Sequence, residues 1–183
     1  MMYDISLATA ATWAGVFLLL VSLPGVIMPN SVANLARKLP RSMVLGIALL
    51  TIAFAWSFWL LWTMEMGEFS TFRKPLLFVL PIGFVLVLRF VNEFLAVRAL
   101  GILCLLAAEP LLGSAFLRYE QSRLLLTVFA YIIIVLGLIW VTMPYVLRDQ
   151  IAWAGRSAAR WLSVSVLGLL YGAVLLFFAF TRY

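Results

Sequence analysis

The sequence predicts an all-α, polytopic integral membrane bundle of about six transmembrane helices, with short loops and one or two interfacial helices. Hydrophobic residues make up 66% of the 183 residues and charged residues only 11%, against roughly 45–50% and 25% in soluble domains. A soluble domain of this size could not bury so much apolar surface. The apolar residues also form continuous runs and do not alternate with polar ones, which argues against membrane strands. Composition therefore excludes a soluble enzyme, a disordered chain and a disulfide scaffold.

Six apolar runs approach the length of about 20 residues that a helix needs to cross the hydrocarbon layer. They form one transmembrane domain over 1–183, and their ranges are 7–28, 43–63, 75–91, 95–117, 124–147 and 161–181. The first run carries Asp4 ahead of it, where a signal peptide would be basic, and no convincing cleavage site follows it, so we expect it to remain as an anchor. Only Asn92 and Glu93 separate the third and fourth runs, which form either a tight hairpin or one bent, partly re-entrant segment.

The basic residues predict the orientation of the chain. Eight fall on one side of six spans, namely Arg37, Lys38, Arg41, Arg89, Arg98, Arg148, Arg156 and Arg160. Five fall on the other side, namely Arg73, Lys74, Arg118, Arg123 and Arg182. Because cytoplasmic loops carry the excess of positive charge, both termini are predicted to lie outside the cytoplasm. The short loops and the uncleaved first span fit a bacterial inner membrane.

Two connectors on the predicted cytoplasmic side resemble each other. Each begins with a Met-Pro pair, at 28–29 and at 143–144, and eleven residues separate this pair from an Arg-Ser pair. The similarity indicates either a parallel repeat, with 1–63 echoed in 124–181, or a chance likeness between apolar hairpins. Internal repeats are common among transporters.

Both connectors could also lie flat in the membrane interface as short helices. Apolar residues recur at helical spacing in 30–42, and the three arginines of 148–160 are separated by multiples of four, which predicts one stripe on a helix. These connectors supply the predicted contacts to anionic headgroups: Arg37, Lys38, Arg41, Arg148, Arg156 and Arg160. The alternative is ordinary anchoring without a binding role.

Glu109 is the strongest single candidate for chemistry. It lies well inside the fourth span and precedes Pro110, which has no N–H to donate to the helix. A charged carboxylate at this depth costs about 2.5–3.5 kcal/mol on insertion scales, so it should be protonated, paired or turned to a wet cavity. We expect either an ion or proton site, with Lys74 as partner if spans three and four pack antiparallel, or a glutamate that fixes helix packing.

A second polar cluster lies at the hairpin tip and consists of Arg89, Glu93 and Arg98. Arg89 and Glu93 are four residues apart, so they could pair on one face if the helix continues. The cluster either binds an anionic headgroup or substrate, or pairs internally at the membrane surface.

Small residues recur four apart in the last and first spans. Gly168 and Gly172 form one such pair, and Ala11 and Gly15 form the other. Small residues let helix backbones approach closely. These faces could join the protein to itself or to another subunit, or could pack helices within the chain.

The counts also limit the chemistry. The chain has no histidine and one cysteine, Cys104, which removes the usual haem and metal ligands and any internal disulfide. We therefore expect no metal and no cofactor. The net charge of +6 lies in short loops between apolar runs, so membrane lipids are expected partners and nucleic acid is not.

Three classes of function remain. The first is a non-catalytic packing or scaffold subunit, or a lipid-interacting bundle, which would contact other subunits or a second copy of itself. The alternative is a small transporter or channel with the Glu109 carboxylate as its ion or proton site. The third is an enzyme acting on lipid, which needs more acid and base groups than these spans contain.

Overall fold

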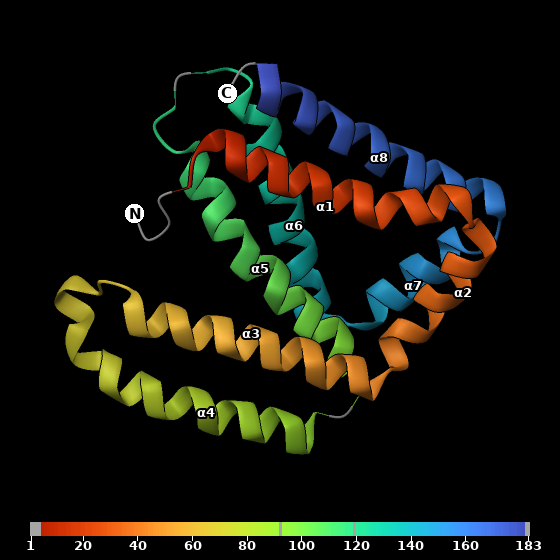
Figure 1. Cartoon of the computed structure of the whole chain (residues 1–183). Helices are drawn as coiled ribbons and strands as arrows, with labels where there is room; N and C mark the ends of the chain where they lie inside the picture. Colours follow the sequence, from red (N-terminus) through yellow and green to blue (C-terminus); the bar gives the residue numbers. More distant parts are fainter. Residues whose placement is uncertain (1–4, 92, 119, 182–183) are drawn as a thin grey trace.

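The computed structural model describes residues 5–91, 93–118 and 120–181, and within them the chain is helical and contains no strand (Figure 1). The all-α prediction is therefore confirmed, and six helices are long and apolar enough to cross a membrane. The α-helices are α1 (Leu7–Ile27), α2 (Pro29–Lys38), α3 (Met43–Thr63), α4 (Arg73–Phe90), α5 (Leu95–Ala115), α6 (Arg123–Thr142), α7 (Tyr145–Ala154) and α8 (Ala158–Thr181). Two 3₁₀ helices, η1 (Leu39–Arg41) and η2 (Gly67–Phe72), precede α3 and α4.

Serine and proline set the helix boundaries. Ser6 and Ser42 cap α1 and α3, each accepting a hydrogen bond from the backbone N–H three residues ahead. The predicted fifth span ran to residue 147, which is wrong, because α6 ends at Thr142 and Pro144 lies at the start of α7. The third and fourth spans are two separate helices, joined by a turn in which Phe94 has a φ of 54°.

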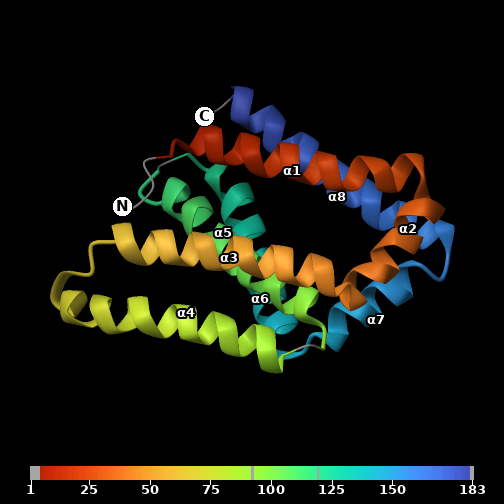
Figure 2. The ribbon, with the colours of Figure 1, turned by 60° about the horizontal axis from the view of Figure 1, so that its bottom comes forward.

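The long helices form three antiparallel pairs, α1 with α8, α3 with α4, and α5 with α6 (Figures 1 and 2). The middle pair runs obliquely between the other two. At its beginning α5 packs against α3, where Leu50 contacts Leu95 and Ala99. At its end it meets α1, where Ala115 joins a buried cluster with Leu7. The helix α5 therefore connects the outer pairs, while α4 has no buried residue.

Glycines hold the backbones of the packed pairs together. A Cβ atom added to Gly172 of α8 would lie 3.0 Å from the carbonyl oxygen of Gly15 in α1, and one added to Gly101 would lie 2.8 Å from that of Gly137. A Cβ on Gly46 of α3 would lie 2.8 Å from the backbone nitrogen of Ala96 in α5. Because lipid tails are as apolar as the side chains, close van der Waals packing must supply the attraction between such helices.

The small residues singled out in the sequence lie inside this bundle. Ala11, Gly15 and Gly172 are buried, and a Cβ on Gly168 would meet the hydroxyl of Ser22. Of the two alternatives for these residues, the structure shows packing within the chain, between α1 and α8.

The two connectors form ten-residue helices, α2 and α7, that contact each other in the corner between α1–α8 and α5–α6 (Figure 1, right). We call this end of the bundle the basic side. Both halves of the proposed repeat have a long helix, a ten-residue helix and a second long helix in that order. Their contacts differ, because α1 packs against α8 whereas α6 packs against α5. The repeat therefore remains a hypothesis.

The glycine contact between α1 and α8 predicts a sharp difference between two substitutions. Gly172→Val should lower the free energy of unfolding by about 1–3 kcal/mol, as expected for overpacking a tight site. Gly83→Val in α4 is the matched control, since no atom lies within 4 Å of its added Cβ. Unfolding of both variants in mild detergent, followed by circular dichroism, measures the difference; equal losses would contradict the assigned contact.

Candidate functional site

Glu109 lies on the outer surface of the α5–α6 pair and is exposed. It lines a shallow, open groove of about 600 Å³. The other lining residues are apolar: Leu105, Ala108, Leu112, Gly113, Phe116 and Ile134. The carboxylate is therefore neither sealed by side chains nor placed in an enclosed cavity.

The predicted pairing of Glu109 with Lys74 is wrong. Within the part of the chain that the structure describes, the one ion pair joins Arg148 and Asp149, at 2.9 Å between nitrogen and oxygen. The pairing required α4 to pack along α5, but α4 packs mainly on α3. Glycines explain why α5 packs against α6 and α3 and not against α4. The backbone of α6 lies close to Gly101 of α5, and the backbone of α5 lies close to Gly46 of α3.

Tyr131 of α6 lies level with Glu109. The added Cβ of Gly101 falls between the backbone of Gly137 and that of Val141, at 2.8 and 3.2 Å, so Gly101 is level with residue 139. The helices are antiparallel, and eight residues forward along α5 reach Glu109 while eight residues back along α6 reach Tyr131. The positions of the two residues along the α5–α6 pair therefore agree to within about one helical rise of 1.5 Å.

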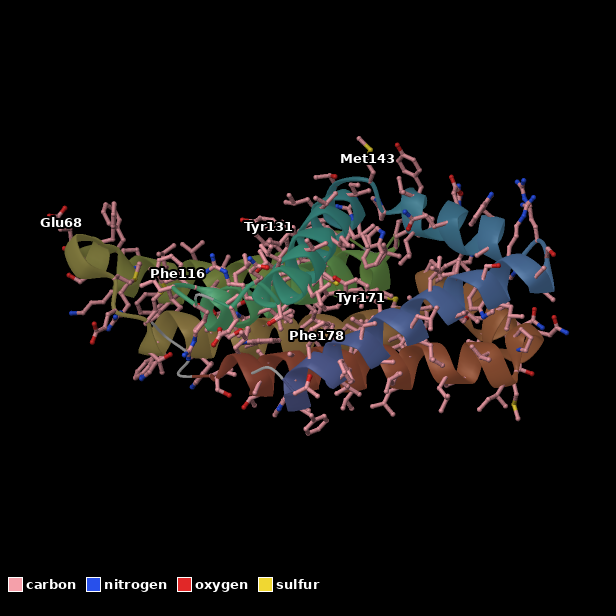
Figure 3. The ribbon with its side chains drawn as sticks, turned by 90° about the horizontal axis from the view of Figure 1, so that it is seen from above. Glu68, Phe116, Tyr131, Met143, Tyr171 and Phe178 are labelled. Atoms are coloured by element: carbon pink, nitrogen blue, oxygen red, sulfur yellow. The ribbon has the colours of Figure 1, made fainter. Side chains whose placement is uncertain are left out.

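The Tyr131 side chain also lies on the same outer face of the α5–α6 pair as Glu109. Tyr131 is 58% exposed, and it precedes the groove residue Ile134 by three positions, which places both on one side of α6. Figure 3 shows Tyr131 on the outer side of α6, away from α1 and α8. The sequence alone does not connect Tyr131 with Glu109, because their relation depends on the register that the Gly101–Gly137 contact sets.

The predicted pairing of Arg89 with Glu93 is also wrong. Helix α4 ends at Phe90, so the two residues do not share a helix face. Glu93 instead lines a pocket of about 250 Å³ together with Arg41. Arg98 lies one turn further along α5, and its buried Nε has no hydrogen-bond partner among the described residues.

The basic residues of the connectors divide into two groups. Three interact with the protein: Arg37 donates from Nη2 to the carbonyl oxygen of Gly155, Arg148 pairs with Asp149, and the Arg160 guanidinium lies 5.4 Å from the Trp153 ring centre. For the side chains of Lys38, Arg41 and Arg156 the described structure gives no hydrogen bond or ion pair. The predicted stripe of Arg148, Arg156 and Arg160 is wrong, because α7 ends at Ala154, and Arg160 belongs to α8.

Charge is distributed unevenly between the two ends of the bundle. All eight basic residues assigned to the first side in the sequence lie at the α2–α7 end, whereas Arg182 of the other group lies outside the described residues. Across the described ranges, no three side chains of His, Cys, Asp or Glu gather in a way that could hold a metal ion.

Arg37 connects the two ten-residue helices, because its guanidinium caps the last turn of α7 from α2. We expect Arg37→Met to speed hydrogen exchange of the amides in 151–155 severalfold, since local opening of that turn becomes easier. Lys38→Met is the matched control, and hydrogen exchange with mass spectrometry is the measurement. Unchanged protection in Arg37→Met would show that the contact does not hold α7.

The site thus consists of an exposed carboxylate and a level phenol on one apolar face, with a separate charged pocket on the basic side. No protein-family model matches the sequence, and no curated protein or solved structure matches it either.

Proposed function

We propose that this chain is a non-catalytic packing subunit of a membrane assembly, and that its outer α5–α6 face binds a second copy of the chain. One observation carries the proposal: the Glu109 carboxyl group is exposed in an apolar groove and has no ion-pair or hydrogen-bond partner among the described residues. In a bilayer this surface faces hydrocarbon, where an unsatisfied polar group costs several kcal/mol. A neighbour that supplies a hydrogen-bond donor removes that cost.

The chain itself carries a donor at the required depth. A two-fold axis along the membrane normal leaves the depth of every residue unchanged, so Glu109 of one copy can meet only a group level with it on the other. Tyr131 is level with Glu109 on the same face, and its hydroxyl can donate to a carboxylate. Two copies would therefore form two reciprocal Glu109–Tyr131 hydrogen bonds, one on each side of the axis.

The expected surroundings are a bacterial inner membrane, with both termini outside the cytoplasm. The uneven charge supports this orientation, since the eight basic residues of the α2–α7 end would face the cytoplasm. Lys38 and Arg156, which the described structure leaves without a polar partner, are available to anionic headgroups at that surface.

Cysteine crosslinking in native membranes tests the proposed face. In a Cys104→Ala background, Ile134→Cys should give a covalent dimer with a short bismaleimide, because this position lines the Glu109 groove. Phe78→Cys is the control, since it is 74% exposed on α4 and lies away from that groove. Equal crosslinking at both positions, or none at Ile134→Cys, would contradict a specific α5–α6 interface.

Substitution of the two polar residues tests the reciprocal pair. Glu109→Ala and Tyr131→Phe should each raise the dissociation constant of the dimer by about tenfold to a few hundredfold. Each substitution removes both reciprocal hydrogen bonds, and hydrogen bonds within membranes contribute about 0.6–1.7 kcal/mol each. The double variant should be no weaker than either single one if the residues bind each other. Sedimentation equilibrium in mild detergent measures these constants.

The matched control for this cycle is Tyr145→Phe, an exposed tyrosine of α7, which should leave dimerisation unchanged. Proton and cation flux into liposomes separates the transporter alternative, for which Glu109→Gln would abolish flux. Additive effects of the two substitutions on dimerisation, or a flux that depends on Glu109 in a monomer, would overturn the proposed function.

A further inference from the structure

We propose that the pocket between η1 and the α4–α5 turn binds a zwitterionic phospholipid headgroup, with a phosphate at Arg41 and a primary ammonium at Glu93. The pocket has a volume of about 250 Å³. Its walls come from two segments distant in sequence, and they consist of Pro40, Arg41, Ser42 and Met43 on one side and Glu93, Phe94 and Leu95 on the other. This inference does not depend on the α5–α6 interface.

Opposite charges line the pocket without neutralising each other. Arg41 and Glu93 both border it, yet among the described residues the one ion pair is Arg148–Asp149. The pocket therefore offers an anion-binding guanidinium and a cation-binding carboxylate across a space that a ligand can enter. A simple anion would be attracted by Arg41 and repelled by Glu93, and a simple cation the reverse. A ligand with both charges satisfies the two groups together.

The size of the pocket fits a small headgroup. Its volume of about 250 Å³ holds several water-sized groups, since about 10–15 Å³ of such volume already holds one water molecule. A phosphoethanolamine moiety is a small headgroup, whereas a sugar headgroup is considerably larger.

Phe94, which lines the pocket, contacts Arg148 of α7. Phe94 has a φ of 54°, a left-handed conformation that is unfavourable for a residue with a side chain. Such strain persists where surrounding contacts enforce it, and it clusters at ligand sites. Here the Arg148 guanidinium lies 5.9 Å from the Phe94 ring centre, and the next residue, Leu95, is 2% exposed. These contacts therefore anchor the Phe94–Leu95 side of the turn that presents Glu93.

The location of the pocket favours a lipid over a soluble ligand. Met43 and Leu95 are the first residues of α3 and α5, so the pocket lies at the level where two apolar helices begin. Met43 is 47% exposed at its rim, which provides an apolar path for acyl chains to continue into the hydrocarbon layer. A headgroup bound between Arg41 and Glu93 would keep its glycerol backbone at the interface.

Lipid titration of the full chain in detergent, read by native mass spectrometry, tests the proposal. The probes are short-chain phosphatidylethanolamine, short-chain phosphatidylglycerol and soluble phosphoethanolamine. The wild-type protein should prefer phosphatidylethanolamine over phosphatidylglycerol by at least about tenfold, a difference of about 1.4 kcal/mol. Glu93→Gln should reverse this order, since it removes the ammonium partner and the repulsion of anions, whereas Arg41→Gln should weaken binding of both lipids.

Two further variants keep this result interpretable. Arg89→Gln is the matched control, because Arg89 is an exposed residue of the same hairpin that does not line the pocket, and its lipid preference should stay as in the wild type. Arg41→Lys should restore part of the binding that Arg41→Gln loses, even if the latter folds poorly. Equal binding of the two lipids to the wild type, or no change of preference in Glu93→Gln, would overturn the proposal. If soluble phosphoethanolamine binds as tightly as the lipid, the proposal that the ligand is a phospholipid would be contradicted.

Discussion

The hydrocarbon layer of a membrane offers neither water nor hydrogen-bond partners, and the rest of this structure depends on that constraint. Backbone polar groups can be satisfied there within helices, and the described chain is almost entirely helical. Several hydroxyl groups follow the same rule, since they donate to the carbonyl oxygen one turn earlier on their own helix. The residues that do so are Thr12, Thr51, Thr63, Thr127, Thr142, Ser163 and Thr181.

The hydrocarbon environment also explains which helices pack against each other. Apolar side chains gain nothing by leaving lipid for one another, so contacts form where glycine lets backbones touch. The Gly15–Gly172 contact joins α1 to α8, and the Gly101–Gly137 contact joins α5 to α6. Gly46 brings α3 close to α5. Glu109 is the exception in this arrangement, because its carboxylate has no hydrogen-bond or ion-pair partner among the residues that the structure describes. In the proposed dimer, Tyr131 of the second copy would supply the missing hydrogen-bond donor.

Helix positions could be predicted from the sequence far better than helix neighbours. The range 43–63 matches α3 at both ends, and 7–28 overruns α1 by one residue, because serine caps and prolines act locally. The range 124–147 overran α6, since the apolar run continues past Pro144 into the interfacial helix α7. The predicted Lys74–Glu109 pair is wrong because it required α4 to pack against α5. The predicted Arg89–Glu93 pair is wrong because it required α4 to continue beyond Phe90. Tyr131 could not be placed beside Glu109 without the register of α5 and α6.

The most direct test of the central claim is the number of copies in each particle within a lipid bilayer. Singly labelled wild-type protein can be reconstituted at decreasing protein-to-lipid ratios and counted by single-molecule photobleaching. A reversible dimer predicts two-step particles that give way to one-step particles as the protein is diluted, following mass action. One-step particles at every density would contradict the account, because the exposed carboxylate would then remain uncovered in the hydrocarbon layer.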